Sequence, residues 1–170
     1  MQILKTITDL DLGIEPVKST ITRERCASRA VVFDKDNNVA LLDATLKNYH
    51  KLPGGGIEEN EDFTQALKRE CKEEIGCYVE VTSEIGIVEE YASRSGFHQL
   101  SYCFIAKVIG EKGVSTLEDD ETADGFKTIW LSLDEAIKIL ANETGVYEGK
   151  FIQLRDLSIL QEAKRIISLK

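Results

Sequence analysis

Three glutamates within five residues, Glu70, Glu73 and Glu74, are the part of this sequence best suited to chemistry. At 100° per residue they fall within an arc of about 100° on one face of a helix. Like charges three or four residues apart destabilise a helix, by a few tenths of a kcal/mol per pair. The acids border the predicted apolar face, and partial burial strengthens their repulsion. That face is formed by Leu67, Cys71, Ile75 and Tyr78.

The basic residues of the same stretch neutralise the negative charge of the three glutamates only in part. Arg69 lies four residues before Glu73 and can pair with it, whereas Lys68 and Lys72 project from the opposite side. Hard divalent cations take carboxylate oxygens as ligands, which favours Mg²⁺ or Mn²⁺ at the acidic cluster. The alternative is a plain acidic face in contact with solvent.

A glycine loop, Leu52-Pro53-Gly54-Gly55-Gly56-Ile57, precedes these acids. It lacks the lysine and hydroxyl of a phosphate-binding P-loop. The acidic residues that follow it, Glu58, Glu59, Glu61 and Asp62, also discourage direct phosphate binding. Its exposed backbone carbonyls are instead suitable ligands for a hard cation, and a tight turn is the simpler interpretation.

The spacing of these residues resembles a known motif. Gly55, Glu61 and the segment Arg69-Glu70-Cys71-Lys72-Glu73-Glu74-Ile75-Gly76-Cys77 match the Nudix box, GX5EX7REUXEEXGU, in which U is a bulky aliphatic residue. Cysteines at the two U positions are the one departure, and buried free cysteine behaves as a small hydrophobe. The chain therefore resembles the Nudix hydrolase family of MutT-like proteins.

The resemblance implies an α/β fold, an α/β/α sandwich with a mixed β-sheet. It also implies Mg²⁺- or Mn²⁺-dependent hydrolysis of the pyrophosphate bond in a nucleoside diphosphate linked to another moiety. Glu70, Glu73 and Glu74 would then bind metal together with the Gly55 carbonyl. Arg69 would orient the glutamates, and Glu61 would support the join between loop and helix. From the acidic loop Glu118–Glu121, Glu121 is the expected additional ligand or base.

Residues for substrate recognition are less clearly marked. Arg29, Lys47 and Lys51 are candidate phosphate contacts, and His98 is a candidate contact to a base or leaving group. Nucleoside triphosphates, nucleotide sugars and related small molecules stay open as substrates. Two other functions share this fold: a catalytically silent module that senses nucleotides or binds a protein, and an isomerase acting on prenyl diphosphates.

The elements that must position these residues follow from hydrophobic periodicity. A β-hairpin is predicted over 30–42, and a helix capped by Asn60 is predicted to end at Ile75 before Gly76. Further strands are predicted over 79–88, 99–108 and 127–131. Helices are predicted from Ser132 to Ala141 and, at the C-terminus, from 151 to 167. We expect one domain over 1–170, with residues 1–18 as an arm or an edge strand.

Composition bounds the functional class. The chain has 170 residues and a formal net charge of −9, which disfavours nucleic acid as a partner. No stretch has the length of a membrane span or a signal peptide, so we expect a cytoplasmic protein without a membrane partner. The four cysteines form no metal-binding or disulfide pattern and are expected to be buried and free.

Overall fold

The computed structural model describes residues 1–117 and 122–169. Its centre is a mixed sheet in which β1–β6 and β2–β7 run parallel and the other pairs run antiparallel. The strands follow the order β1 (Ile3–Thr8), β6 (Tyr78–Ala92), β7 (Phe97–Ile109), β2 (Arg23–Phe33), β3 (Asn38–Ala44) and β4 (Tyr49–Lys51). Off this path, β5 (Gly54–Gly56) pairs with β2, and β8 (Phe126–Ser132) pairs with β3.

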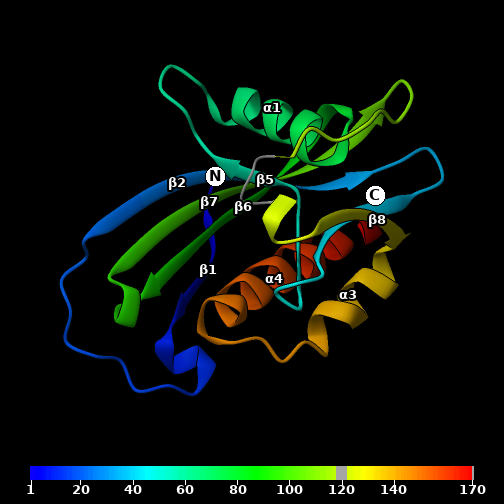
Figure 1. The fold of residues 1–170 in the computed structure, drawn as a ribbon. Coiled ribbons are helices and arrows are strands. Elements are labelled where there is room, and N and C mark those ends of the chain that lie inside the picture. Colours follow the sequence, from blue (N-terminus) through cyan, green and yellow to red (C-terminus); the bar gives the residue numbers. More distant parts are fainter. Residues whose placement is uncertain (118–121, 170) are drawn as a thin grey trace.

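Helices cover both faces of this sheet (Figure 1). Helix α1 (Phe63–Ile75) lies on one face, and α3 (Leu133–Ala141) and α4 (Tyr147–Ser168) lie on the other. The α/β/α sandwich expected from the sequence is thereby confirmed. None of the helices in the described part of the chain is long and apolar enough to span a membrane.

Strand β2 separates two hydrophobic cores because its side chains alternate between the two faces. Ala30 and Val32 pack with the apolar side of α1, and Val31 and Phe33 pack with the apolar sides of α3 and α4. All four side chains are buried. The strand therefore fixes α1 on one side and α4 on the other at a defined position along the sheet.

The start of α1 differs from the prediction. Its N-cap is Asp62, whose carboxylate accepts hydrogen bonds from the backbone N–H groups of Thr64 and Gln65, both at 2.8 Å. Asn60, the predicted cap, lies two residues earlier with a positive φ of 68°. The cost of that conformation is lower for Asn than for most residues. The shift leaves Glu61 in the loop, where it reaches back toward the helix.

The end of α1 agrees with the prediction, but one assigned residue does not belong to its apolar face. Gly76 ends the helix with φ 65°. Tyr78 is exposed on β6, under the ammonium of Lys72 at 5.3 Å from the ring centroid. The cysteine prediction fails at one position, since Cys26 is exposed while the other three cysteines are buried.

The N-terminal residues include an edge strand, one of the two predicted alternatives, whereas the long strands differ from the prediction. Residues 3–8 form β1, an edge strand parallel to β6. Strands β6 and β7 extend beyond the predicted ranges, to Ala92 and from Phe97. The extension of β6 carries Glu90 to the side of the sheet that α4 covers, where it lines a cavity with Gln99 of β7 and Arg155 of α4.

Candidate functional site

Arg69 ties the glycine loop to the acids of α1. Its Nε and Nη2 donate to the two carboxylate oxygens of Glu61, at 2.9 and 3.0 Å. Its Nη1 donates to Glu70 at 3.0 Å and to Glu73 at 3.1 Å, and Nη2 also donates to the Gly56 carbonyl at 2.9 Å. The hydrogen bonds from Arg69 lower the pKa of Glu61. One guanidinium therefore holds three carboxylates and the loop backbone in a fixed arrangement.

Glu74 is held by a different set of contacts. Its carboxylate is buried and accepts from Lys51 Nζ at 2.7 Å and from the backbone N–H of Gly54 at 2.6 Å. Burial outweighs both contacts and raises the pKa of Glu74 to about 8. The loop is therefore fixed to the helix at Gly54 as well as at Gly56.

Gly55 lies against the carboxylate of Glu70. A Cβ atom at Gly55 would overlap both oxygens of that carboxylate. Burial raises the pKa of Glu70, even though Arg69 and Lys51 act in the opposite direction. Only a residue without a side chain lets the acid approach the loop backbone this closely.

This donor set fits a hard divalent cation such as Mg²⁺ or Mn²⁺. Among the residues that the structure describes, Glu61, Glu70, Glu73 and Glu74 share two cations, Arg69 and Lys51, which leaves negative charge uncompensated. Carboxylate and carbonyl oxygens are the ligands such ions prefer. Within 1–117 and 122–169, no three acidic, histidine or cysteine side chains already converge on one ion position. In this arrangement the protein's own cations contact the glutamate oxygens.

The predicted substrate contacts divide into two groups. Lys51 contacts Glu74, and Arg29 lies against the glycine loop: Arg29 is buried and its Nη1 donates to the Gly54 carbonyl at 2.8 Å. Lys47 lies in the turn after β3, 3.4 Å from Asp124. His98 lies on the other face of the sheet from Arg29. Glu121 falls outside the described residues.

His98 and His50 do not form a common site. His98 stacks on Tyr91 and contacts Glu89 at 3.1 Å. His50 contacts Glu143 through Nδ1 at 2.6 Å, and that hydrogen bond raises the pKa of His50. Burial raises the pKa values of the thiols of Cys71, Cys77 and Cys103. The separation of the two histidines does not supply the paired histidines that the isomerase alternative calls for, and three of the four thiols are buried.

A cavity of about 270 Å³ lies on the α4 side of the sheet and is connected to the glutamates through Lys51, which lines it and pairs with Glu74. Five basic side chains line it, together with aromatic, acidic and amide side chains: Arg23, Arg25, Arg29, Lys51, Arg155, Tyr49, Phe97, Phe151, Glu90, Glu148 and Gln99. Among the basic residues of this lining, the sequence had singled out only Arg29 and Lys51. A signal existed in Arg23, Arg25 and Arg29, whose even spacing places all three on one face of a strand.

The raised pKa of Glu74 gives the site a defined pH dependence. Below about pH 8 Glu74 carries a proton that a divalent cation has to displace. We expect the dissociation constant for Mn²⁺, measured by electron paramagnetic resonance, to fall by up to about tenfold per pH unit between pH 6 and 8. Glu74→Gln should bind Mn²⁺ more weakly at pH 8 and with a flatter pH profile. A wild-type profile in that variant would remove Glu74 from the ligand set.

Replacement of Arg69 tests its structural role. Arg69→Gln removes charged hydrogen bonds to Glu61, Glu70 and Glu73 and should lower the free energy of unfolding by about 2–3 kcal/mol. Arg69→Lys keeps the charge but not the planar fork, so it should recover only part of that loss. Chemical denaturation measures both, and full recovery by lysine would show that charge alone matters.

Comparisons with known proteins agree with this geometry. The model of the NUDIX domain matches residues 24–154. An ADP-ribose pyrophosphatase of Methanocaldococcus jannaschii is 34% identical over 82 residues, which are 46% of this chain and 48% of that protein. The chain thus spans about half the length of that relative. Diphosphoinositol polyphosphate phosphohydrolase 3-alpha of Mus musculus is 33% identical over 121 residues, 69% of each chain.

Solved structures share the fold. A NUDIX hydrolase from Nitrosomonas europaea superposes with a TM-score of 0.65 at 19% identity, covering 84% of this chain and 89% of that one. At this identity the likeness concerns the fold alone. The family model, however, spans most of the chain and includes the loop and helix that carry Gly55 and the glutamates. The chain belongs to the NUDIX domain family.

Proposed function

We propose that this protein hydrolyses the pyrophosphate bond of a nucleoside diphosphate linked to another moiety, with Mg²⁺ or Mn²⁺ as its cofactor. The observation that carries the proposal is the gathering of Glu70, Glu73 and Glu74 around the glycine loop, with more carboxylates than cations. The relatives named above as an ADP-ribose pyrophosphatase and a diphosphoinositol polyphosphate phosphohydrolase support the same class of reaction.

The three glutamates and the Gly55 carbonyl are the proposed metal ligands. When bound, the ion supplies charge neutralisation at the phosphates and acidifies a water molecule that attacks phosphorus. Arg69 keeps Glu70 and Glu73 close together in the absence of the ion and, as a positioning residue, holds Glu61 and the loop. Lys51 does the same for Glu74 from β4.

Proton transfer from the attacking water falls to a carboxylate of this site. Burial raises the pKa values of both Glu70 and Glu74, which makes each a stronger base than an ordinary exposed glutamate. Glu70 is the more accessible of the two, with 15% of its side chain exposed against 2% for Glu74. We therefore assign the base role to Glu70, with Glu121 as the other candidate.

A substrate panel tests the reaction class. It contains ADP-ribose, a nucleotide sugar, a dinucleoside tetraphosphate, 8-oxo-dGTP and a diphosphoinositol polyphosphate, each with Mg²⁺, with Mn²⁺ or with EDTA. The proposal predicts release of a phosphate or monophosphate product from at least one compound with metal and none with EDTA. Inertness toward every compound, with retained nucleotide binding, would contradict it in favour of the silent module.

A further inference from the structure

We infer that the cavity beside the glutamates selects a substrate that carries an additional anionic group, a phosphate or a carboxylate, outside its diphosphate, and that Arg23 and Arg25 recognise that group. The inference rests on the proposed function, because it takes the diphosphate to lie at the glutamates. It concerns specificity, which neither the family match nor the box residues determine.

The cavity and the glutamates share one backbone segment. The N–H of Gly54 donates to Glu74, and the carbonyl of the same residue accepts from Arg29, which lines the cavity. Lys51 also lines the cavity while its ammonium pairs with Glu74. We therefore place the groups that adjoin the diphosphate of the substrate in this cavity, next to Lys51 and Arg29.

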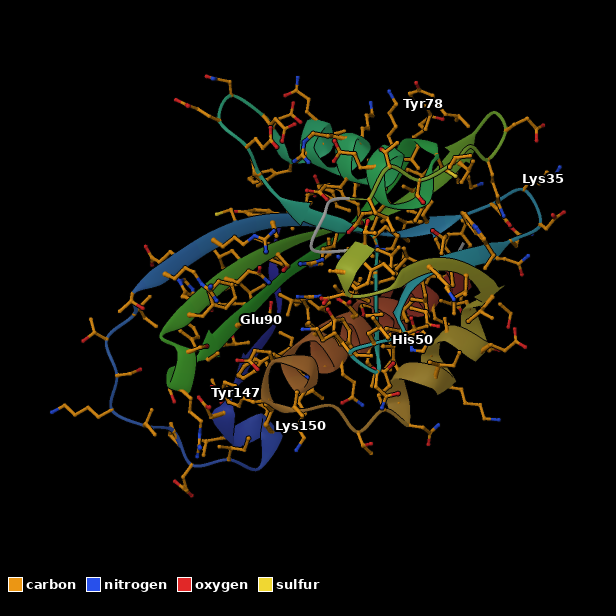
Figure 2. The ribbon with its side chains drawn as sticks, in the orientation of Figure 1. Lys35, His50, Tyr78, Glu90, Tyr147 and Lys150 are labelled. Atoms are coloured by element: carbon orange, nitrogen blue, oxygen red, sulfur yellow. The ribbon has the colours of Figure 1, made fainter. Side chains whose placement is uncertain are left out.

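The cavity is basic in a protein of net charge −9. Part of its charge is neutralised internally: Arg155 forks onto Asp156 at 2.6 and 3.1 Å and lies 3.6 Å from Glu90. Glu90 also accepts from Gln99 at 2.6 Å, and Figure 2 shows it on the side of the sheet that α4 covers. The charge of Arg155 is thus balanced by neighbouring carboxylates, whereas the arginines of β2 contribute the positive charge of the cavity.

Arg29 shows an unmet need for an acceptor. It is 4% exposed, and its Nε has no hydrogen-bond partner among the residues that the structure describes. Burial and the nearby charge of Arg155 lower the pKa of Arg29 to about 10. A buried guanidinium with an unpaired N–H is stabilised by a ligand oxygen, and by an anionic oxygen most of all.

Arg23 and Arg25 extend this cationic row to the mouth of the cavity. Both are exposed, and they lie on the same face of β2 as Arg29 because side chains alternate along a strand. The guanidinium of Arg23 stacks 4.5 Å from the ring centroid of Phe97, which limits its motion. Planar guanidinium groups bind phosphate and carboxylate through paired hydrogen bonds, whereas a neutral sugar offers them no matching charge.

Matched pairs of compounds test this selectivity. NADPH and NADH differ by one phosphate, coenzyme A and its 3′-dephospho form differ by another, and UDP-glucuronate and UDP-glucose differ by a carboxylate. We expect kcat/KM for the anionic member to exceed that of its partner by about tenfold or more in at least one pair. The phosphate and carboxylate pairs show which oxyanion the cavity prefers.

Two variants connect any preference to the arginines. The double variant Arg23→Gln/Arg25→Gln should bring the ratio of kcat/KM toward one, and both positions are exposed, so the fold should tolerate the change. Lys138→Gln, which removes an exposed charge from α3, is the matched control and should keep the wild-type ratio. Equal or reversed preference in every pair, or a preference that survives in the double variant, overturns the inference.

Binding without turnover separates this inference from the proposed function. Calorimetric titration of each pair in EDTA measures affinity when hydrolysis does not occur. Preferential binding of an anionic member that is lost in the double variant supports the cavity assignment even if no compound is cleaved, in which case the proposed reaction alone fails. If several pairs are hydrolysed without preference for the anionic member, the proposed reaction is supported and the inferred specificity is wrong.

Discussion

Replacing Glu73 by glutamine is expected to lower kcat by about three orders of magnitude while the protein remains folded. Glutamine keeps the size of the side chain but removes the negative charge that a divalent cation needs, and loss of metal-assisted charge stabilisation costs several kcal/mol in the transition state. Glu73 suits this test because 35% of its side chain is exposed, and its charged contact, the hydrogen bond from Arg69 at 3.1 Å, is shared with other carboxylates.

The measurement is the release of monophosphate from the best substrate of the panel, with circular dichroism to verify the fold. Glu80→Gln is the matched control, since Glu80 is an exposed glutamate on β6 that lies outside the site, and it should keep wild-type turnover. Turnover close to wild type in Glu73→Gln would remove this carboxylate from the catalytic machinery.

Gly55→Ala has the second largest expected effect. The new Cβ would overlap the carboxylate of Glu70, which would have to rotate away from the loop. We expect kcat/KM to fall by about a hundredfold, because displacements of about 1 Å at reacting groups have effects of this size. The crowding should also lower the free energy of unfolding by about 1–3 kcal/mol.

A second glycine gives the control for this change. Gly149 lies in α4, and a Cβ there would meet nothing within 4 Å. Gly149→Ala should therefore leave activity unchanged and raise stability by up to about 1 kcal/mol, since alanine favours a helix. Wild-type kcat/KM in Gly55→Ala would mean that the close approach of Glu70 to the loop has no role in the reaction.

The sequence was sufficient to predict the local part of this site. Glu70, Glu73 and Glu74 share one helix face because helical periodicity determines their spacing, and Arg69 lies one turn from Glu73 for the same reason. The end of α1 at Gly76 also follows from a local rule, since glycine adopts a left-handed conformation easily. Contacts between residues up to four positions apart on a helix can therefore be predicted from the sequence.

Contacts between segments that are distant in the sequence could not be predicted. Lys51 was predicted as a candidate phosphate contact, but its pairing with Glu74 was not predicted, because that pairing depends on how β4 lies beside α1 in the folded protein. The pairing of Arg155 with Glu90 joins α4 to β6 across the sheet, and no local pattern connects them. The error at Asn60 is of another kind: both it and Asp62 are good caps, and geometry selected the second.

The most direct test is to locate the metal itself. Crystals soaked in Mn²⁺ and measured at a wavelength where manganese scatters anomalously would show the ion as a peak. We expect that peak about 2.0–2.3 Å from oxygens of at least two of Glu70, Glu73 and Glu74, with Arg69 or Lys51 displaced from its present partner. If crystals soaked at a saturating Mn²⁺ concentration show no anomalous peak there, and Arg69 and Lys51 still contact the same carboxylates, the account is contradicted.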